Sequence, residues 1–102
     1  MALTFHLKEG DGFFVGLPEG IVPLRVVNVT PAGNVNRFSV EVEGREYKIT
    51  EELATEVLPD VRVSAGLASD SSQAVVLTEA PKSISIDRLY EVAKKKHDRN
   101  RA

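Results

Sequence analysis

The sequence predicts a small, mainly β domain with two short helices, and three observations support that fold class. Apolar and polar residues alternate with a period of two in several separate segments of the 102-residue chain, as half-buried strands require. The alternating segments are short and are separated by Gly, Pro, Asn and Asp, which favour turns. Helical spacing of apolar residues occurs in only two places. We therefore expect seven or eight short strands in a small antiparallel sheet or barrel-like domain.

The expected strands share this alternation or are short apolar runs. They are residues 3–8, 13–15, 21–29, 38–43, 46–49, 61–65, 73–77 and 83–86. The strongest is 21–29, in which Leu24 and Val26 share one face and Arg25 lies on the other. Pro23 predicts an edge or a bulge near the start of that strand, because proline cannot donate to a ladder.

Two helices are expected at positions with capping chemistry. Thr50 is suited to cap a helix over 51–58, which begins with two glutamates and is stopped by Pro59. Asp87 is suited to cap a second, amphipathic helix, since its carboxylate can accept from the free amides of the next turn. The three lysines at 94–96 would then lie in the last turn of that helix, where cations suit its dipole.

Composition and charge exclude several classes of protein. The absence of Cys excludes disulfides and thiolate sites and fits a reducing cytoplasm, where we expect the protein to reside. No apolar run is long enough for a membrane span, and the N-terminus lacks signal-peptide architecture. The net charge of −2 hides an uneven distribution, because residues 94–101 carry five basic residues against one acidic residue. We therefore expect one β-rich domain over 1–93 and a basic tail over 94–102, which is either a solvated, frayed terminus or a contact segment.

Residue patterns that carry enzymatic chemistry are not found. His6 and His97 lie in different predicted segments, and neither has the neighbours of a metal site or a nucleophile–base pair. Gly10-x-Gly12 precedes a strand, so it does not fit a phosphate-binding loop. The dipole of the expected helix accounts for Glu51 and its neighbour. We expect neither an enzyme nor a cofactor.

A nucleic-acid-binding surface is the better prospect. β modules that bind RNA use strand edges, arginine side chains and a few apolar residues to hold unstacked bases. Arg88 stands at a strand–helix junction, Lys82 in the preceding turn and Lys8 on the first strand. These cations would form one patch if the first and last strands lie together. The alternative is that Arg88 is only a surface residue of the first helical turn.

Four segments together resemble the carbon storage regulator family (CsrA/RsmA). The stretch APKSISIDRLY, residues 80–90, is similar to the family's last strand and the arginine that opens its helix. Residues 3–16 resemble its first hairpin, 22–29 its third strand and 73–76 its fourth. The resemblance covers about half of the chain. Residues 30–72 would be an insertion, and a faint internal echo, which matches Ile49-Thr50-Glu51 with Ile86-Asp87-Arg88, suggests a copied strand–helix unit or simply convergence.

The resemblance implies a translational repressor that binds GGA-containing RNA. In that family two subunits interlock, the first strand of one lies beside the last strand of the other, and RNA binds along that pair. Carried over to this sequence, the RNA-binding residues are Phe5, Lys8, Lys82, Ser85, Ile86 and Arg88.

Departures from the family pattern predict weakened or altered RNA binding. Leu7 stands where the family has an arginine, and Asp87 stands where it has a histidine. Loss of a phosphate-facing cation removes part of the electrostatic attraction, and Asp87 adds repulsion beside Arg88. The first copy of the echo has Glu51 in place of that arginine, so it should not bind RNA in the same way. The alternative function is a protein-interaction module on the same fold, acting as a homodimer or through a protein partner.

Overall fold

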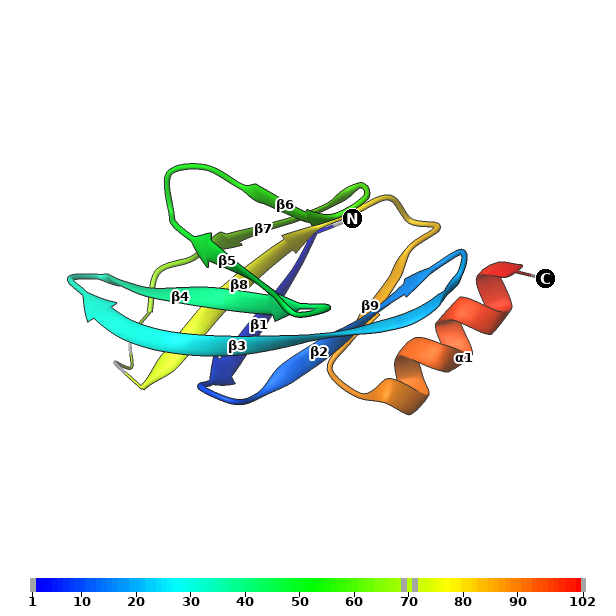
Figure 1. The fold of residues 1–102 in the computed structure, drawn as a ribbon, viewed down its shortest axis with the longest axis horizontal. Helices are drawn as coiled ribbons and strands as arrows, with labels where there is room; N and C mark the ends of the chain where they lie inside the picture. Colours follow the sequence, from blue (N-terminus) through cyan, green and yellow to red (C-terminus); the bar gives the residue numbers. More distant parts are fainter. Residues whose placement is uncertain (1, 69, 71, 102) are drawn as a thin grey trace.

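The computed structural model describes residues 2–68, 70 and 72–101, and within them it confirms a mainly β fold (Figure 1). The described residues form nine strands and one helix. The elements are β1 (Ala2–Lys8), β2 (Gly12–Leu17), β3 (Gly20–Ala32), β4 (Val35–Val42), β5 (Arg45–Ile49), β6 (Thr55–Leu58), β7 (Val61–Ala65), β8 (Gln73–Glu79), β9 (Ser85–Asp87) and α1 (Tyr90–Arg101).

The strands form two antiparallel sheets that enclose one apolar core. The four-stranded sheet has the order β1-β8-β7-β6, and the five-stranded sheet has the order β5-β4-β3-β2-β9. Each sheet contributes its inward-facing residues to one continuous cluster, as the period of two predicts. The largest fully buried side chains are Leu7, Phe13, Val15, Leu24, Val26, Val40, Ile49, Val61, Val63, Val76 and Ile86.

Each sheet is built around a meander of three consecutive strands. β2, β3 and β4 pair in succession in the five-stranded sheet, and β6, β7 and β8 do so in the four-stranded sheet. Of the remaining pairings, β4 with β5 is a local hairpin, whereas β1 with β8 and β9 with β2 link distant parts of the chain. The segment 30–72, expected as an insertion, therefore supplies strands to both sheets. Pro23 lies where β3 is paired only with β2, before its ladder with β4 begins at Leu24.

The prediction of a helix over residues 51–58 is wrong. Residues 51–53 form a bend, and Thr55–Leu58 is strand β6, which is joined to β7 by the turn Pro59-Asp60. Proline presets the first position of such a turn, and Asp60 adopts the left-handed conformation with φ 64° that the second position of a type II turn requires. The short apolar run suits a strand as well as a helix, and the adjoining turn allows it to pair with β7.

The C-terminal helix begins later and extends further than the sequence predicts. The Leu89 carbonyl accepts the first helical bond, from the Ala93 amide at 3.0 Å, so Leu89 rather than Asp87 occupies the capping position. The helix then continues to Arg101, so the three lysines lie in its middle and not in its last turn. It is held against β2 and β9, with Ala93 and His97 buried. Most of the segment expected as a basic tail is therefore part of a packed helix.

Residues 69–72 read Ser-Asp-Ser-Ser, a composition that predicts a polar loop, and Ser69 and Ser71 of this segment lie outside the described residues. Asp70 forms a local turn, because its Oδ1 accepts from the Ser72 amide at 2.8 Å and from the Ser72 hydroxyl at 2.7 Å. These bonds hold the pKa of the exposed Asp70 carboxyl below its usual value, and the charge of Lys8 acts in the same direction. The buried amide of Asn36 donates to the carbonyls of Asp70 and Gln73, so it ties this loop to β4.

Candidate nucleic-acid interface

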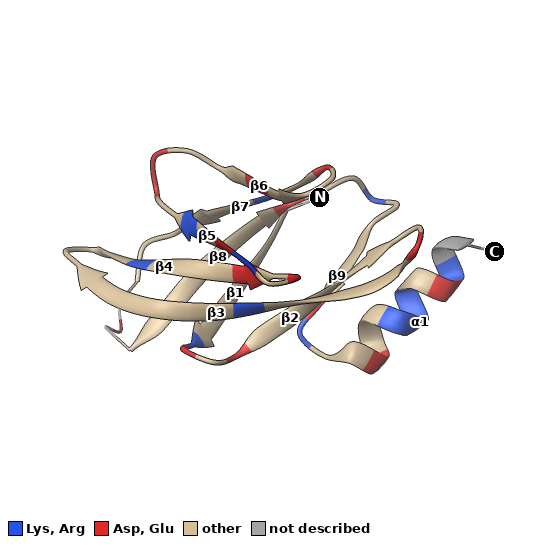
Figure 2. Ribbon diagram, viewed as in Figure 1, with Lys and Arg blue, Asp and Glu red and all other residues tan. Residues whose placement is uncertain are grey.

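Two of the predicted RNA-binding residues meet at one carboxylate. The Oδ2 of Asp11 accepts a bond from the Lys8 amide at 3.2 Å and forms an ion pair with Nη2 of Arg88 at 3.3 Å. We call Lys8, Asp11 and Arg88 the Asp11 corner. It joins the β1–β2 turn to the β9–α1 junction, although Asp11 and Arg88 are 77 residues apart in the chain. Figure 2 shows basic and acidic segments next to one another in both places.

The turn that presents this corner is fixed by backbone bonds. Asp11 donates its amide to the Lys8 carbonyl at 2.9 Å, which closes the turn between β1 and β2. Gly10, at φ 94°, adopts a conformation that is costly for other residues, and its amide reaches the Val26 carbonyl at 2.8 Å. The Val26 amide in turn donates to the Asp11 carbonyl at 2.8 Å. The turn is thereby tied to the centre of the five-stranded sheet.

The cations of the corner are accessible but only partly free. The side chain of Arg88 is 54% exposed and that of Asp11 is 41% exposed, so their ion pair lies at the surface and contributes at most about 1 kcal/mol. The Lys8 side chain is exposed, and its ammonium forms no ion pair with another residue in the described part of the chain. A polyanion could therefore displace Asp11 from Arg88 at a small cost.

The apolar members of the predicted site are less accessible. Phe5 lies on the inward face of β1 and stacks on Phe13, with ring centroids 5.4 Å apart, so only part of its ring is exposed. Leu7, two residues further on, is fully buried. The family's arginine could not be accommodated at that position in this fold, because the side chain would enter the core.

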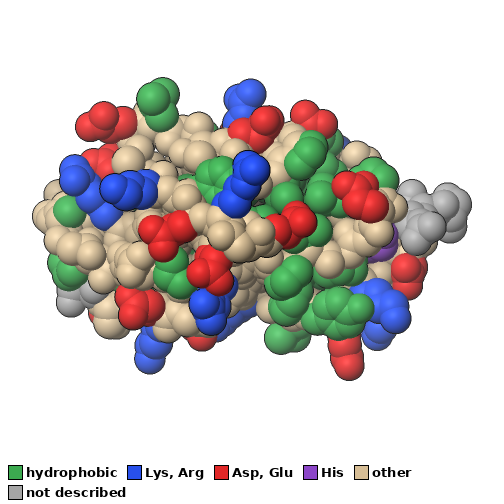
Figure 3. Space-filling model, viewed as in Figure 1, with side chains coloured by type: hydrophobic (Ala, Val, Ile, Leu, Met, Phe, Trp, Pro, Cys, Tyr) green, Lys and Arg blue, Asp and Glu red, His purple; other side chains and the backbone are tan. Residues whose placement is uncertain are grey.

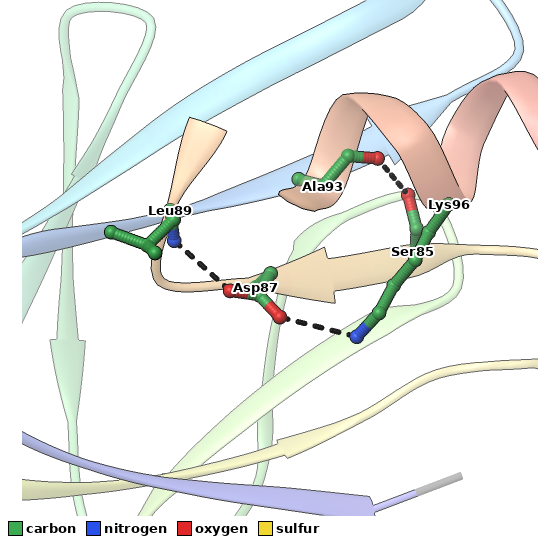
Figure 4. A network of polar contacts seen from close by, with 5 residues as sticks. All are labelled: Ser85, Asp87, Leu89, Ala93 and Lys96. Carbon is green, nitrogen blue, oxygen red and sulfur yellow. Dashed lines mark hydrogen bonds and ion pairs between the residues drawn. The ribbon is translucent and has the colours of Figure 1, made fainter. Parts of the chain in front are cut away.

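The side chains of Ser85 and Ile86 are buried on opposite faces of β9. Ile86 is 1% exposed and belongs to the core between the sheets. Ser85 is 3% exposed, and its hydroxyl donates to the Ala93 carbonyl of α1 at 3.1 Å (Figure 4). Ser85 cannot reach a ligand without movement of the helix, and Ile86 cannot reach one without opening of the core. Only backbone groups of β9 remain for such a contact, on the side away from its ladder with β2.

Lys82 is exposed but lies apart from the corner. It precedes β9, whereas Arg88 follows it, so the two cations stand at opposite ends of this strand. The structure thus brings the backbone of Lys8 and the side chain of Arg88 to Asp11 and leaves Lys82 outside the group.

Asp87 is directed toward the helix rather than toward Arg88. Its Oδ1 accepts from the Leu89 amide at 3.0 Å, and its Oδ2 forms an ion pair with Nζ of Lys96 at 3.1 Å (Figure 4). Partial burial alone would raise the pKa of this carboxyl, but the bonds from Leu89 and Lys96 outweigh it and leave the pKa below its usual value. Lys96 also offsets the charge of Asp87, which reduces the repulsion expected beside Arg88.

Sequence reasoning missed the environment of His97, which it assigned to an exposed tail. His97 is 6% exposed, and its Nε2 has no hydrogen-bond partner among the described residues. The available signal was the spacing of Leu89, Ala93 and His97, which recur every four residues and so share one face of a helix. In the parts of the chain that the structure describes, no group of three or more His, Cys, Asp or Glu residues, with or without His97, is placed to hold a metal ion.

Comparisons with protein-family models, with curated proteins and with solved structures found no match to this chain. Over the described ranges, no helix is long and apolar enough to cross a membrane.

Proposed function

We propose that this protein binds single-stranded RNA at the Asp11 corner and regulates translation, as the carbon storage regulator family that it resembles would imply. The observation that carries the proposal is the convergence of the Lys8 backbone amide and the Arg88 guanidinium on Asp11 from opposite ends of the chain. Arginine and lysine at a strand edge are the residues that RNA-binding β modules use for phosphates and for exposed base edges.

The pairing of the strands gives further support. In the family, the first strand of one subunit lies beside the last strand of the other. Here β1 and β9 are edge strands of different sheets, and the chain segments at their ends meet at Asp11. Each of these strands pairs with the meander in the other half of the chain, β1 with β8 and β9 with β2. We propose that the two halves act as the two interlocked subunits do, so that one chain forms one RNA site.

In this proposal Asp11 limits the affinity of the site. Its carboxylate occupies Arg88 when RNA is absent, and a phosphate must displace it. Once displaced, the carboxylate repels the phosphate. This competition predicts binding that is weaker than the cations alone would give, and it predicts that removing the charge of Asp11 raises the affinity.

The test compares three variants by the fluorescence anisotropy of a labelled RNA hairpin with a GGA loop. Arg88→Ala should weaken binding about tenfold, because it removes a charge-assisted contact. Asp11→Asn should strengthen it severalfold, while the amide oxygen can still accept from the Lys8 backbone. Arg37→Ala, an exposed arginine on β4, is the control with the same change in charge and should have no effect. A hairpin without the GGA loop should bind weakly to all four proteins.

The dependence on salt gives a second readout. The apparent binding constant should fall with added salt, and the slope should become shallower in Arg88→Ala because one phosphate contact is lost. If Arg88→Ala and Arg37→Ala reduce binding equally, or if Asp11→Asn has no effect, the site does not lie at the Asp11 corner.

A protein partner is the second candidate. Three surface ion pairs, Arg25–Glu41, Arg88–Asp11 and Lys96–Asp87, neutralise cations that RNA binding would need to be free. Leu89 and Tyr90, next to the corner, are 63% and 48% exposed and present apolar surface. Absence of RNA binding, together with capture of a partner that is lost in Leu89→Asp, would favour this function.

A further inference from the structure

A pocket at the opposite end of β2 from the Asp11 corner has a buried histidine in its wall. The pocket has a volume of about 450 Å³ and lies where the β2–β3 turn, the β6–β7 turn, the segment before β9 and α1 come together. It is therefore formed by elements of both sheets and by the helix. Figure 3 shows hydrophobic side chains interspersed with acidic ones at the end of the molecule that carries α1.

Much of the pocket wall is apolar. Pro18, Pro59 and Pro81 contribute one rigid ring each, and Leu17 and Ile84 are buried beside them. Proline rings and aliphatic side chains offer contact to a hydrocarbon stem and leave few backbone donors for an anion. The walls thus favour a ligand with an aliphatic portion.

His97 gives the pocket a polar group without a partner. It is 94% buried, as its exposed fraction of 6% shows, and it lines the pocket. Its Nε2 has no hydrogen-bond partner among the described residues, which leaves a buried polar atom unsatisfied at a cost in free energy. This nitrogen has less than 1 Å² of accessible surface, so a ligand reaches it only once the imidazole turns toward the pocket. A neutral imidazole can then present a lone pair at this nitrogen and accept a bond.

The carboxylates around the pocket select the charge of that ligand. Glu19 and Asp60 line it, and neither forms an ion pair with a described residue. An adjoining hollow shares Asp60 and adds Glu56 and Glu79, against the single cation Arg62. Carboxylates only accept hydrogen bonds, so an anionic ligand would be repelled, whereas a cationic donor would satisfy both the carboxylates and Nε2 of His97.

We infer that this pocket binds an organic cation, a guanidinium or ammonium group on an aliphatic stem. A guanidinium is the better match, because its several N–H groups can serve the imidazole and a carboxylate together. The cation has two sources with the same chemistry, an arginine side chain of a polypeptide and a free guanidino or amino compound. This site does not depend on the proposed RNA function, since it shares no residue with the Asp11 corner.

Titration followed by the imidazole signals of the protein tests the inference. The probes are N-acetyl-arginine methylamide, ethylguanidinium, and the norleucine and glutamate analogues of the first probe. The arginine probe should shift the His97 signals saturably and leave those of His6 unchanged, because His6 is an exposed residue on β1. The norleucine and glutamate probes should not produce this shift. Binding of the arginine probe alone points to a polypeptide ligand, and equal binding of ethylguanidinium points to a small compound; both outcomes support the cation site.

Two sets of variants keep the test independent of folding. Glu19→Gln with Asp60→Asn leaves the apolar walls intact and should weaken binding of the arginine probe about tenfold. His97→Phe removes the acceptor and should abolish saturable binding, while urea unfolding confirms that the variant is folded. Arg88→Ala, the matched control, should bind the probe as the wild type does. The inference is overturned if no probe shifts His97, if the norleucine probe shifts it equally, or if the carboxylate variants bind the arginine probe unchanged.

Discussion

The close contact of α1 with β2 predicts that Gly16→Ala destabilises the protein by about 2–4 kcal/mol. A Cβ at Gly16 would lie 2.4 Å from the Ser85 hydroxyl and 3.0 Å from both Cβ and Nδ1 of His97. Overpacking of this kind typically costs about 1–3 kcal/mol. If Ser85 rotates away, its bond to the Ala93 carbonyl is lost, which adds about 1 kcal/mol.

A double-mutant cycle separates this contact from a general loss of stability. Ser85→Ala alone should cost about 1 kcal/mol, because it removes the bond to the helix. In the double variant the shortest contact is absent, so the total cost should be about 2 kcal/mol less than the sum of the single costs. The control combines Gly16→Ala with Ser39→Ala, because Ser39 is also buried, at 5% exposure, but lies on β4; these two changes should be additive.

The free energy of unfolding comes from urea titration followed by far-ultraviolet circular dichroism. If Gly16→Ala is as stable as the wild type, or if Ser85→Ala and Ser39→Ala combine with it in the same way, then α1 does not pack on β2 as described. The same result would weaken the inference about the pocket, because the helix positions His97 there.

Two further predictions concern Asp87 and Leu7, the sequence neighbours of Arg88 and Lys8 in the Asp11 corner. Because the pKa of Asp87 is lower in the folded protein, its carboxylate stabilises the fold fully above the pKa of the unfolded chain, about 3.9. This stabilisation is lost as the pH falls through the lower pKa of the folded state. Asp87→Asn should thus cost about 1 kcal/mol in urea unfolding near neutral pH and nothing in strong acid; an equal cost at both would exclude the charge as the cause. Leu7→Arg, which introduces the arginine found in the carbon storage regulator family, should destabilise the protein by more than about 3 kcal/mol, because Leu7 is 0% exposed; an unchanged urea midpoint would contradict this.

The strands were predictable because their signal is local. The alternation in 61–65 and the short apolar run in 73–77 each need only five neighbouring residues, and the structure has strands at both places. The segment 51–58 shows where local signals fail, since Val57 and Leu58 are compatible with either a helix or a strand. The left-handed conformation at Asp60 and the ladder with β7 decide between them, and the ladder is a tertiary contact.

The candidate site was predictable only in part, because it depends on pairing between distant segments. The sequence identified Lys8 and Arg88 as cations at strand ends, but it did not single out Asp11, which joins them. It could not show that Ser85 is buried, since its burial requires α1 to pack on β9 with the Ala93 carbonyl over the Ser85 hydroxyl, or that Ile86 is fully buried, since this requires the second sheet to cover it. The same packing of α1 places His97 in the wall of a pocket.

The two meanders have equivalent outer edges, and the way each is covered explains why the halves of the chain differ. The edge of β8 is covered by β1, the strand that begins the chain. The edge of β4 is covered by β5, the strand that follows it directly through the tight turn Glu43-Gly44, where φ is 49° and 82°. Because β5 remains on its own meander, the chain after it is not brought to β1.

Glu51 therefore follows a strand that has no counterpart of the Asp11 corner beside it, whereas Arg88 follows β9, which crosses to β2 and meets the β1–β2 turn. The acidic side chain of Glu51 and the basic side chain of Arg88 are consistent with this difference in surroundings. A second RNA site would need both another copy of β1 along β4 and a cation in place of Glu51. If the proposed RNA site exists, the asymmetry of the fold thus argues that it occurs once in each chain.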